Sequence, residues 1–185
     1  MASAKKKSTG NSGSGGRVHT ASEPVAVYSH TRAGFQPLSI RAVRVKAEKG
    51  HRVYGQALGM AIRDTRQLLR VLKEGLGFEA FEFLCAELQV NQAHLAEVCG
   101  IATRTLARRK LEGRLQALES ERVYRIAALF DQAKEVLGNH DEARRWFKEG
   151  SRALAGAAPL EYAGTEIGAR EVEDLLGRLE YGVFS

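Results

Sequence analysis

The residues best suited to chemistry are the basic side chains between positions 103 and 114. In the stretch RTLARRKLEGR, five arginine and lysine residues are accompanied by a single acidic residue, Glu112. Cations at this density beside the start of a helix are typical of proteins that contact DNA phosphates and read base edges in the major groove. We therefore predict DNA binding. The predicted contact residues are Thr103, Arg104, Thr105, Arg108, Arg109, Lys110 and Arg114.

The residues just before this basic stretch have the spacing of a helix-turn-helix. Ala96 is small enough to let two helices approach, Gly100 suits a left-handed turn, and Ile101 fills the core that the two helices share. Ala102 or Thr103 begins the second helix, and Thr103 is the better N-cap. The alternative is an ordinary helical hairpin in which Gly100 only ends a helix. The basic composition of the second helix favours DNA binding.

The C-terminal residues EYGVFS form a second group of interest. No charged side chain follows Glu180, and Gly182 separates the last apolar residues from the preceding helix. A frayed helix end is one interpretation of such a tail. The other is a segment that binds in a cleft of a partner, because rigid aromatic side chains provide contact area at low entropic cost.

Catalytic and metal-binding chemistry has little support in the sequence. Cys85 and Cys99 have neither a CxxC spacing nor a paired histidine motif, so free buried thiols are the simpler interpretation. The histidines are scattered, and adjacent acidic residues such as Glu173 and Asp174 do not face one another on a helix. We predict a protein that is not an enzyme and that has no metal site and no cofactor.

Charge is distributed unevenly along the 185 residues, which carry a formal net charge of +6. Residues 1–85 hold 14 basic and 6 acidic residues, whereas residues 136–185 hold 6 basic and 9 acidic residues. This asymmetry indicates that one end faces a polyanion and the other end a different partner, although a basic tail that only adds solubility is the alternative. No run of about 18 apolar residues is present, so we expect a cytoplasmic protein without a membrane partner.

The elements that position these groups are predicted to be helices throughout, because apolar residues recur at three- and four-residue intervals. The first two apolar stripes consist of Leu58, Ile62, Leu69 and Leu72, and of Phe78, Phe81, Leu84, Cys85 and Leu88. The other two consist of Val123, Ile126, Ala127, Phe130, Ala133 and Leu137, and of Ile167, Val172, Leu175, Leu176 and Leu179. The third stripe is either core or a dimer seam.

Capping signals divide the chain into these helices. The predicted N-caps are Asp64, Ser120, Asp141 and Thr165, and Pro159 is predicted to be the first residue of a helix. Gly75 and Gly138 are predicted to end helices.

Three segments follow from this organisation. Residues 1–55 are a basic arm rich in glycine and serine, which we expect to be disordered because it cannot bury enough apolar surface. Residues 56–118 form the helix-turn-helix domain, and residues 119–185 form a second helical domain whose helix 119–137 links or dimerises. Since one small helix-turn-helix makes few base contacts, we expect a homodimer that reads an inverted repeat.

Three stretches of the sequence resemble a known family. RTLARRKLEGRL, SERVYRIAALFDQAKEVLGNHDEARRWF and PLEYAGTEIGAREVEDLLGRLEYGVFS are similar to the Xre/MbcA/ParS antitoxins, the partners of RES-domain toxins. The resemblance covers about residues 64–185. The chain departs from the family in the loop LAGAAP, which usually has two glycines and is more polar, and residues 1–55 have no counterpart.

The resemblance implies a type II toxin–antitoxin system. It implies an Xre-like helix-turn-helix domain followed by a toxin-binding domain, a cognate RES-domain toxin that consumes NAD, and repression of the protein's own operon. It also implies that the C-terminal tail blocks the active site of the toxin. By this resemblance the toxin-binding residues are Arg178, Tyr181, Gly182, Val183, Phe184 and Ser185. The alternative function is a stand-alone repressor whose C-terminal domain senses a ligand or dimerises.

Overall fold

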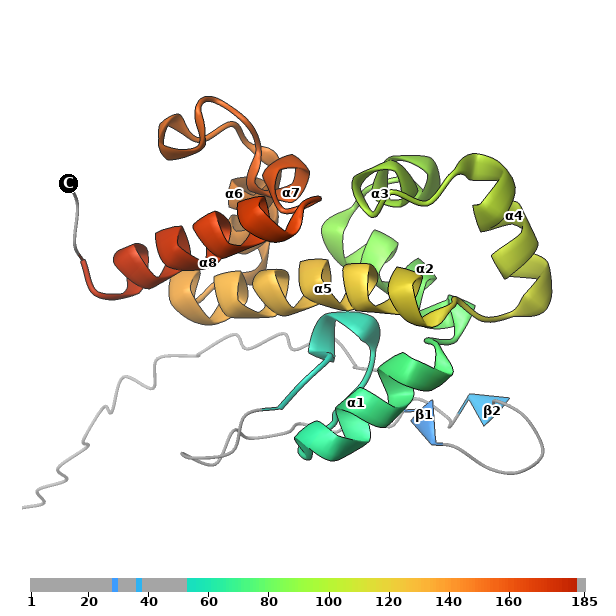
Figure 1. The fold of residues 1–185 in the computed structure, drawn as a ribbon. Helices are drawn as coiled ribbons and strands as arrows, with labels where there is room; N and C mark the ends of the chain where they lie inside the picture. The colour runs from blue at the N-terminus through green and yellow to red at the C-terminus, as the bar shows by residue number, and fades with distance from the viewer. Residues whose placement is uncertain (1–27, 30–35, 38–52, 183–185) are drawn as a thin grey trace, which may run out of the picture.

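The structure is a computed structural model that describes residues 28–29, 36–37 and 53–182 (Figure 1). The predictions for the basic arm fall almost entirely outside the described residues, and those for Val183, Phe184 and Ser185 fall wholly outside them. In the described part of the arm, strands β1 (Tyr28–Ser29) and β2 (Gln36–Pro37) form a short antiparallel pair.

Residues 53–182 contain eight α-helices and two short 3-10 helices, so the predicted all-α fold is confirmed. The first half contains η1 (Gln56–Leu58), α1 (Thr65–Glu74), α2 (Phe78–Leu88), α3 (Gln92–Val98) and α4 (Thr103–Glu112). The second half contains α5 (Ala117–Leu137), α6 (His140–Lys148), η2 (Arg152–Leu154), α7 (Pro159–Tyr162) and α8 (Glu166–Glu180). No helix in the described part of the chain is both long enough and apolar enough to cross a membrane.

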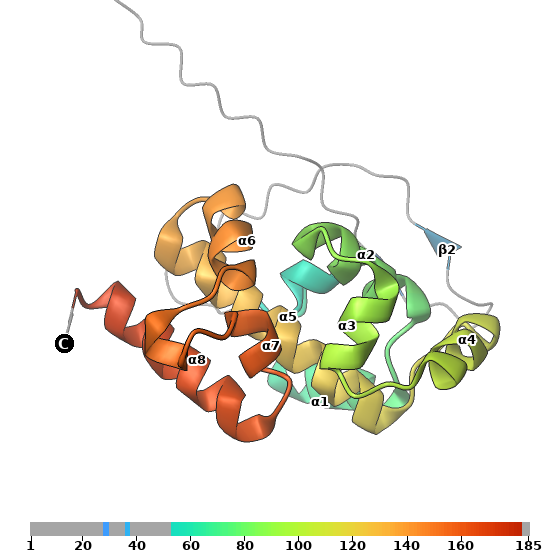
Figure 2. The same cartoon turned by 90° about the horizontal axis from the view of Figure 1, so that it is seen from above.

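Helix α5 is the element around which the others pack. It has 21 residues, which corresponds to about 30 Å of helix, and α1, η1, α6 and α8 all contact it. Figure 1 shows α1 on one side of α5 and α3 and α8 on the other side. Figure 2 shows α4 beyond one end of α5 and the C-terminal end of α8 beyond the other. The DNA-binding candidates of α4 and the C-terminal end of α8 therefore lie at opposite ends of the molecule.

The apolar stripe of α5 belongs to the core of the single chain. At most 1% of the surface of each of these side chains is exposed: Val123, Ile126, Ala127, Phe130 and Ala133. The ring of Phe130 meets that of Phe147 edge to face, with the ring centroids 5.6 Å apart. These five side chains are therefore covered within one chain and belong to its core.

Several predicted helix ends are confirmed. The side chain of Asp64 accepts a hydrogen bond from the backbone N–H of Arg66, and that of Thr165 accepts one from Gly168. Pro159 is the first residue of α7, and Gly138 ends α5 in a left-handed conformation. These residues act as their types predict.

Three predicted N-caps are wrong. Helix α5 begins earlier than predicted, with Gln116 as its N-cap, and Ser120 is buried inside it. Asn139 rather than Asp141 caps α6, and Ala102 rather than Thr103 precedes α4. In each case the structure uses a residue one to four positions earlier than the predicted one.

Two residues of the predicted apolar stripes are exposed. Leu69 is 53% exposed, whereas its neighbour Leu68 is buried against the core. Ile167 is 74% exposed because the next residue, Gly168, packs against the backbone of α7. A Cβ atom at Gly168 would lie 1.9 Å from the carbonyl oxygen of Tyr162, so only glycine fits there.

Candidate functional site

Helices α3 and α4 are joined by the tight turn that the sequence predicted. The side chain of Asn91 caps α3 by accepting a hydrogen bond of 2.8 Å from the backbone N–H of His94. Gly100 has φ +63°, which favours glycine. The N–H of Ile101 donates to the carbonyl oxygen of Ala96 at 2.7 Å, and the Ile101 side chain is only 4% exposed. This arrangement is that of a helix-turn-helix, with α4 as its second helix.

One face of α4 is open to solvent. Thr103, Arg104, Ala107, Arg108 and Leu111 are exposed and recur at three- and four-residue intervals, which places them on a single face. Arg108 lies 3.7 Å from the carboxylate of Glu112, an exposed pair that binds its partner weakly. Thr103, Arg104 and Arg108 are therefore free to contact a ligand along this face.

Arg109 does not belong to this face, and its prediction as a DNA contact is corrected. Only 3% of its side chain is exposed. Its Nε atom lies 2.7 Å from Glu119 and its Nη1 atom 2.6 Å from Glu112, so both sides of the guanidinium are occupied. Burial alone would raise the pKa of Glu119, but hydrogen bonds from Arg109 and from the backbone of Gln116 lower it below its usual value. Arg109 thus fastens α4 to α5.

The remaining predicted contacts of α4 are partly engaged within the protein. Lys110 lies 3.4 Å from Glu82 and over the ring of Phe78, with its Nζ atom 5.9 Å from the ring centroid. Arg114 donates to the carbonyl oxygen of Glu74 at 3.1 Å, and Thr105 is half-buried. Of the seven predicted residues, Thr103, Arg104 and Arg108 are the ones that the structure presents freely.

The C-terminal candidates lie on α8 and just after it. Arg178 is exposed, and Tyr181 is 79% exposed. Gly182, with φ +66°, follows the end of the helix and is the last described residue. Five of the exposed residues of α8 recur on one face, and they are Ile167, Arg170, Glu171, Asp174 and Arg178. This outer face of α8 leads directly to the tail.

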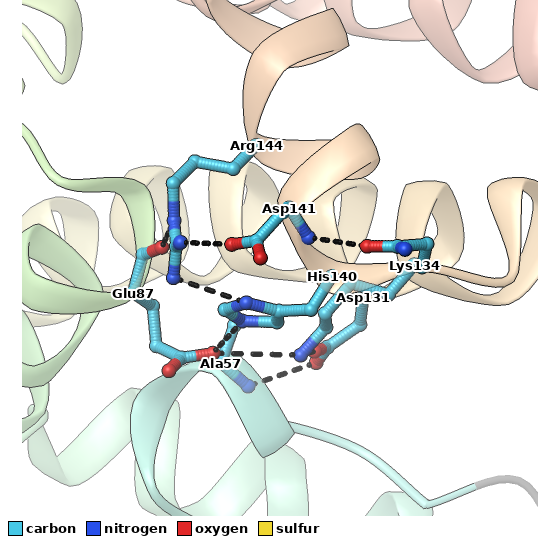
Figure 3. A network of polar contacts seen from close by, with 8 residues as sticks. Ala57, Glu87, Asp131, Lys134, His140, Asp141 and Arg144 are labelled. Carbon is cyan, nitrogen blue, oxygen red and sulfur yellow. Dashed lines mark hydrogen bonds and ion pairs between the residues drawn. The ribbon is translucent and has the colours of Figure 1, made fainter. Parts of the chain in front are cut away.

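A network of polar contacts joins the two halves of the molecule (Figure 3). At its centre is Glu87 of α2, whose carboxylate lies 2.9 Å from Nε2 of His140 and 3.7 Å from Nζ of Lys134. The backbone oxygen of Glu87 accepts a hydrogen bond of 2.7 Å from Nε of Arg144. Because α2 belongs to the first half and α6 to the second, these bonds hold the halves in one orientation.

Two further contacts reinforce this arrangement. The side chain of Asp131 accepts a hydrogen bond from the N–H of Ala57 at 3.2 Å and lies 2.7 Å from Nζ of Lys134. Burial raises the pKa of Asp131. On the other side of α5, Nε2 of His94 in α3 lies 2.6 Å from the carboxylate of Glu161 in α7.

The thiols of the two cysteines do not have the properties of reactive cysteines. Cys85 and Cys99 are free and buried, as predicted, and burial raises the pKa of each to about 12. A thiol with such a pKa stays protonated near neutral pH and is unreactive. Among the described residues, no group of three or more histidine, cysteine and acidic side chains is placed to hold a metal ion.

Comparison with known proteins identifies two regions of the chain. Residues 67–128 match the model of the antitoxin Xre-like helix-turn-helix domain. Residues 132–182 match that of the antitoxin Xre/MbcA/ParS C-terminal toxin-binding domain. The first match ends and the second begins within α5. Residues 53–66 precede both matches.

Curated relatives agree with these matches. The chain is 31% identical over 136 residues to a protein named antitoxin Xre from Yersinia enterocolitica, which covers 72% of this chain and 92% of the relative. It is also 31% identical over 117 residues to an antitoxin Xre from Photorhabdus laumondii, which covers 62% of this chain and 79% of the relative. Over a shorter stretch of 64 residues, the chain is 30% identical to an antitoxin Xre from Pseudomonas putida.

Proposed function

The chain belongs to the Xre antitoxin family, and on that premise we propose that it neutralises a RES-domain toxin that degrades NAD and represses its own operon. The observation that carries the proposal is the presence of a helix-turn-helix domain and a toxin-binding domain in adjacent parts of one chain. A stand-alone repressor needs only the first of these. We assign DNA binding to residues 56–118 and toxin binding to residues 119–185, with α5 shared by both.

We assign DNA recognition to the open face of α4. Thr103, Arg104 and Arg108 lie in its first two turns, the part of a second helix that enters the major groove in helix-turn-helix proteins. Since these three side chains give one copy little specificity, the protein acts as a homodimer on an inverted repeat. Lys110 and Arg114 stand at the far end of α4 and contact phosphates.

We assign toxin inhibition to the tail that begins at Tyr181. Its support is that Tyr181 is 79% exposed and that Gly182 follows it at positive φ, so the α-helix has ended at this point. An uncharged, apolar segment with aromatic side chains can enter the substrate cleft of the toxin, because such side chains provide rigid contact area. Arg178 and the outer face of α8 hold the toxin while Val183, Phe184 and Ser185 enter its active site.

A gel shift with a double variant and a matched control tests the assignment of DNA binding. Replacing Arg104 and Arg108 together by alanine should weaken binding to the promoter of the protein's own gene about 10- to 100-fold in a gel shift at fixed salt. The matched control replaces Arg145 and Lys148 of α6, two exposed cations at the other end of α5. Equal affinity of the α4 variant and wild type would exclude α4 as the reading helix.

Co-purification tests the assignment of the toxin. The protein should form a stable complex with a RES-domain protein encoded beside it when the two are co-expressed. A protein that represses transcription but never co-purifies with its genetic neighbour would instead be the stand-alone repressor. The DNA-binding variant above should still form the complex, because its substitutions lie far from α8.

A further inference from the structure

Helix α1 carries a stripe of cations that the helix-turn-helix does not explain. Arg66, Arg70 and Lys73 are exposed and stand at positions i, i+4 and i+7, so they share one face of the helix. Leu68 and Leu72 lie on the opposite face and are buried against the core. The helix is therefore fixed to the molecule with its basic face outward.

The cations of this stripe have no partner in the described part of the chain. No ion pair there involves Arg66, Arg70 or Lys73, whereas Arg170, another exposed cation, pairs with Glu166 four residues away on its own helix. Glu74 stands four residues from Arg70 and does not pair with it. Like charges at this spacing destabilise a helix, so the stripe lowers the stability of α1 and brings no compensating contact inside the protein.

The C-terminal end of α1 is joined to the end of the helix assigned to DNA. The N–H of Phe78 donates to the carbonyl oxygen of Gly113 at 2.9 Å, and the N–H of Leu115 donates to that of Leu76 at 2.8 Å. Arg114 adds its bond to the carbonyl oxygen of Glu74. These contacts join the segment after α1 to the turn between α4 and α5, and Figure 1 shows α1 reaching the same end of α5 as α4.

We propose that the basic face of α1 is a second DNA-binding surface, which contacts the phosphate backbone beside the bases that α4 reads. Seven residues separate Arg66 from Lys73, which is about 10 Å along a helix. A duplex carries a negative charge about every 1.7 Å along its axis, so several phosphates lie within reach of the stripe. Long flexible cations on one helix face bind phosphates and do not specify bases.

Duplex DNA fits this face better than an acidic protein does. Arg114, just after α4, donates to the carbonyl oxygen of Glu74, the residue after Lys73, so the cations at the end of α1 and those after α4 lie in neighbouring parts of the molecule. The toxin-binding assignment lies at the opposite end of α5, with the outer face of α8. The inference rests on the proposed DNA binding, since it extends the same interface.

The test is a salt titration of DNA binding by a triple variant of the full chain, Arg66→Ala, Arg70→Ala and Lys73→Ala. Alanine favours helix, so α1 should remain folded, and thermal unfolding checks this. The magnitude of the slope of log affinity against log salt should decrease by about 2.7, because each of three phosphate contacts contributes about 0.9. Raising the salt from about 50 to about 200 mM should then weaken wild type about 40-fold more than the variant, both on the promoter duplex and on a random duplex of equal length.

The control and the outcomes separate the inference from the proposed function. The control variant, Arg145→Ala, Lys148→Ala and Arg152→Ala, removes the same charge from exposed positions of α6 and η2 and should keep the slope of wild type. A slope equal to that of wild type in the α1 variant would overturn the inference while leaving DNA binding by α4 intact. Loss of toxin binding with unchanged DNA binding would also overturn it, because the stripe would then be a protein-docking surface. Failure of wild type to bind either duplex would contradict the proposed function itself.

Discussion

Arg109 and Ser120 show how single side chains hold α4 and the segment after α1 against α5. Arg109 joins α4 to Glu119 of α5, and Ser120, the next residue of α5, receives a hydrogen bond of 2.8 Å from the N–H of Leu76. The hydroxyl of Ser120 in turn donates to the carbonyl oxygen of Gln116. The first turn of α5 thus holds both α4 and the segment after α1.

Ser120→Ala should lower the free energy of unfolding by about 1–3 kcal/mol, because it leaves the buried N–H of Leu76 without an acceptor. Urea unfolding at neutral pH measures this. Thr103→Ala is the control, since Thr103 is exposed and such changes stay within about 0.5 kcal/mol. Equal small effects of both substitutions would mean that Ser120 contributes only its volume.

Glu119 should make the protein sensitive to acid. The pKa of Glu119 is lower in the folded protein than its ordinary value of 4.5. The folded state therefore binds a proton on Glu119 only at a lower pH than the unfolded state does. The stabilisation is therefore complete above about pH 4.5 and is lost as the pH falls from there through the lower, folded pKa. Urea unfolding at pH 6 and pH 3.5 should show a smaller loss of stability for Glu119→Gln than for wild type. An identical loss would exclude Glu119 as a source of acid sensitivity.

At the scale of elements, the interiors of the helices were predictable where the apolar residues that recur at helical spacing are also the buried ones. The first residues of the helices were harder to predict. The stripes of α2 and α5 are predicted correctly because core packing alone determines them. The caps at Ser120 and Asp141 are wrong because several polar residues precede each helix, and only the packed fold selects Gln116 and Asn139.

The candidate site was predictable to a similar degree. Composition and spacing identified α4 and its turn. Periodicity alone could not separate the outward Arg108 from the inward Arg109, because Glu119, one of the two partners of Arg109, meets it only when α4 packs against α5. The stripe on α1 was missed, although its i, i+4, i+7 spacing was a signal in the sequence.

Replacing glycine by alanine should have opposite effects on stability at Gly75, which ends α1, and at Gly177, which lies inside α8. Gly75 ends α1 with φ +93°, and a Cβ atom there would lie 2.1 Å from the carbonyl oxygen of Leu115, so Gly75→Ala should destabilise the protein by more than about 1 kcal/mol. Gly177 lies inside α8 with open space around it, so Gly177→Ala should stabilise by about 0.5–1 kcal/mol. Chemical denaturation compares the two. A stable Gly75→Ala variant would contradict the tight connection between α1 and the end of α4.

At the scale of the whole molecule, the two functional halves form one folded body. One cluster of buried residues runs from Ala57 to Leu176, and contacts such as Glu87 with His140 and His94 with Glu161 cross between the halves. Unfolding of the full chain should therefore be a single transition, with the same midpoint by circular dichroism and by fluorescence of the single tryptophan, Trp146. Two separate transitions would show that the halves fold independently.

The most direct test of the account is growth rescue by the full chain and by a chain that ends at Tyr181, each co-expressed with the cognate RES-domain toxin at matched protein levels. Residues after Tyr181 are not part of the described core, so removing them should leave DNA binding and thermal stability close to those of wild type. If the tail blocks the active site of the toxin, the full chain should restore growth and the shortened chain should not. Full rescue by the shortened chain would contradict it.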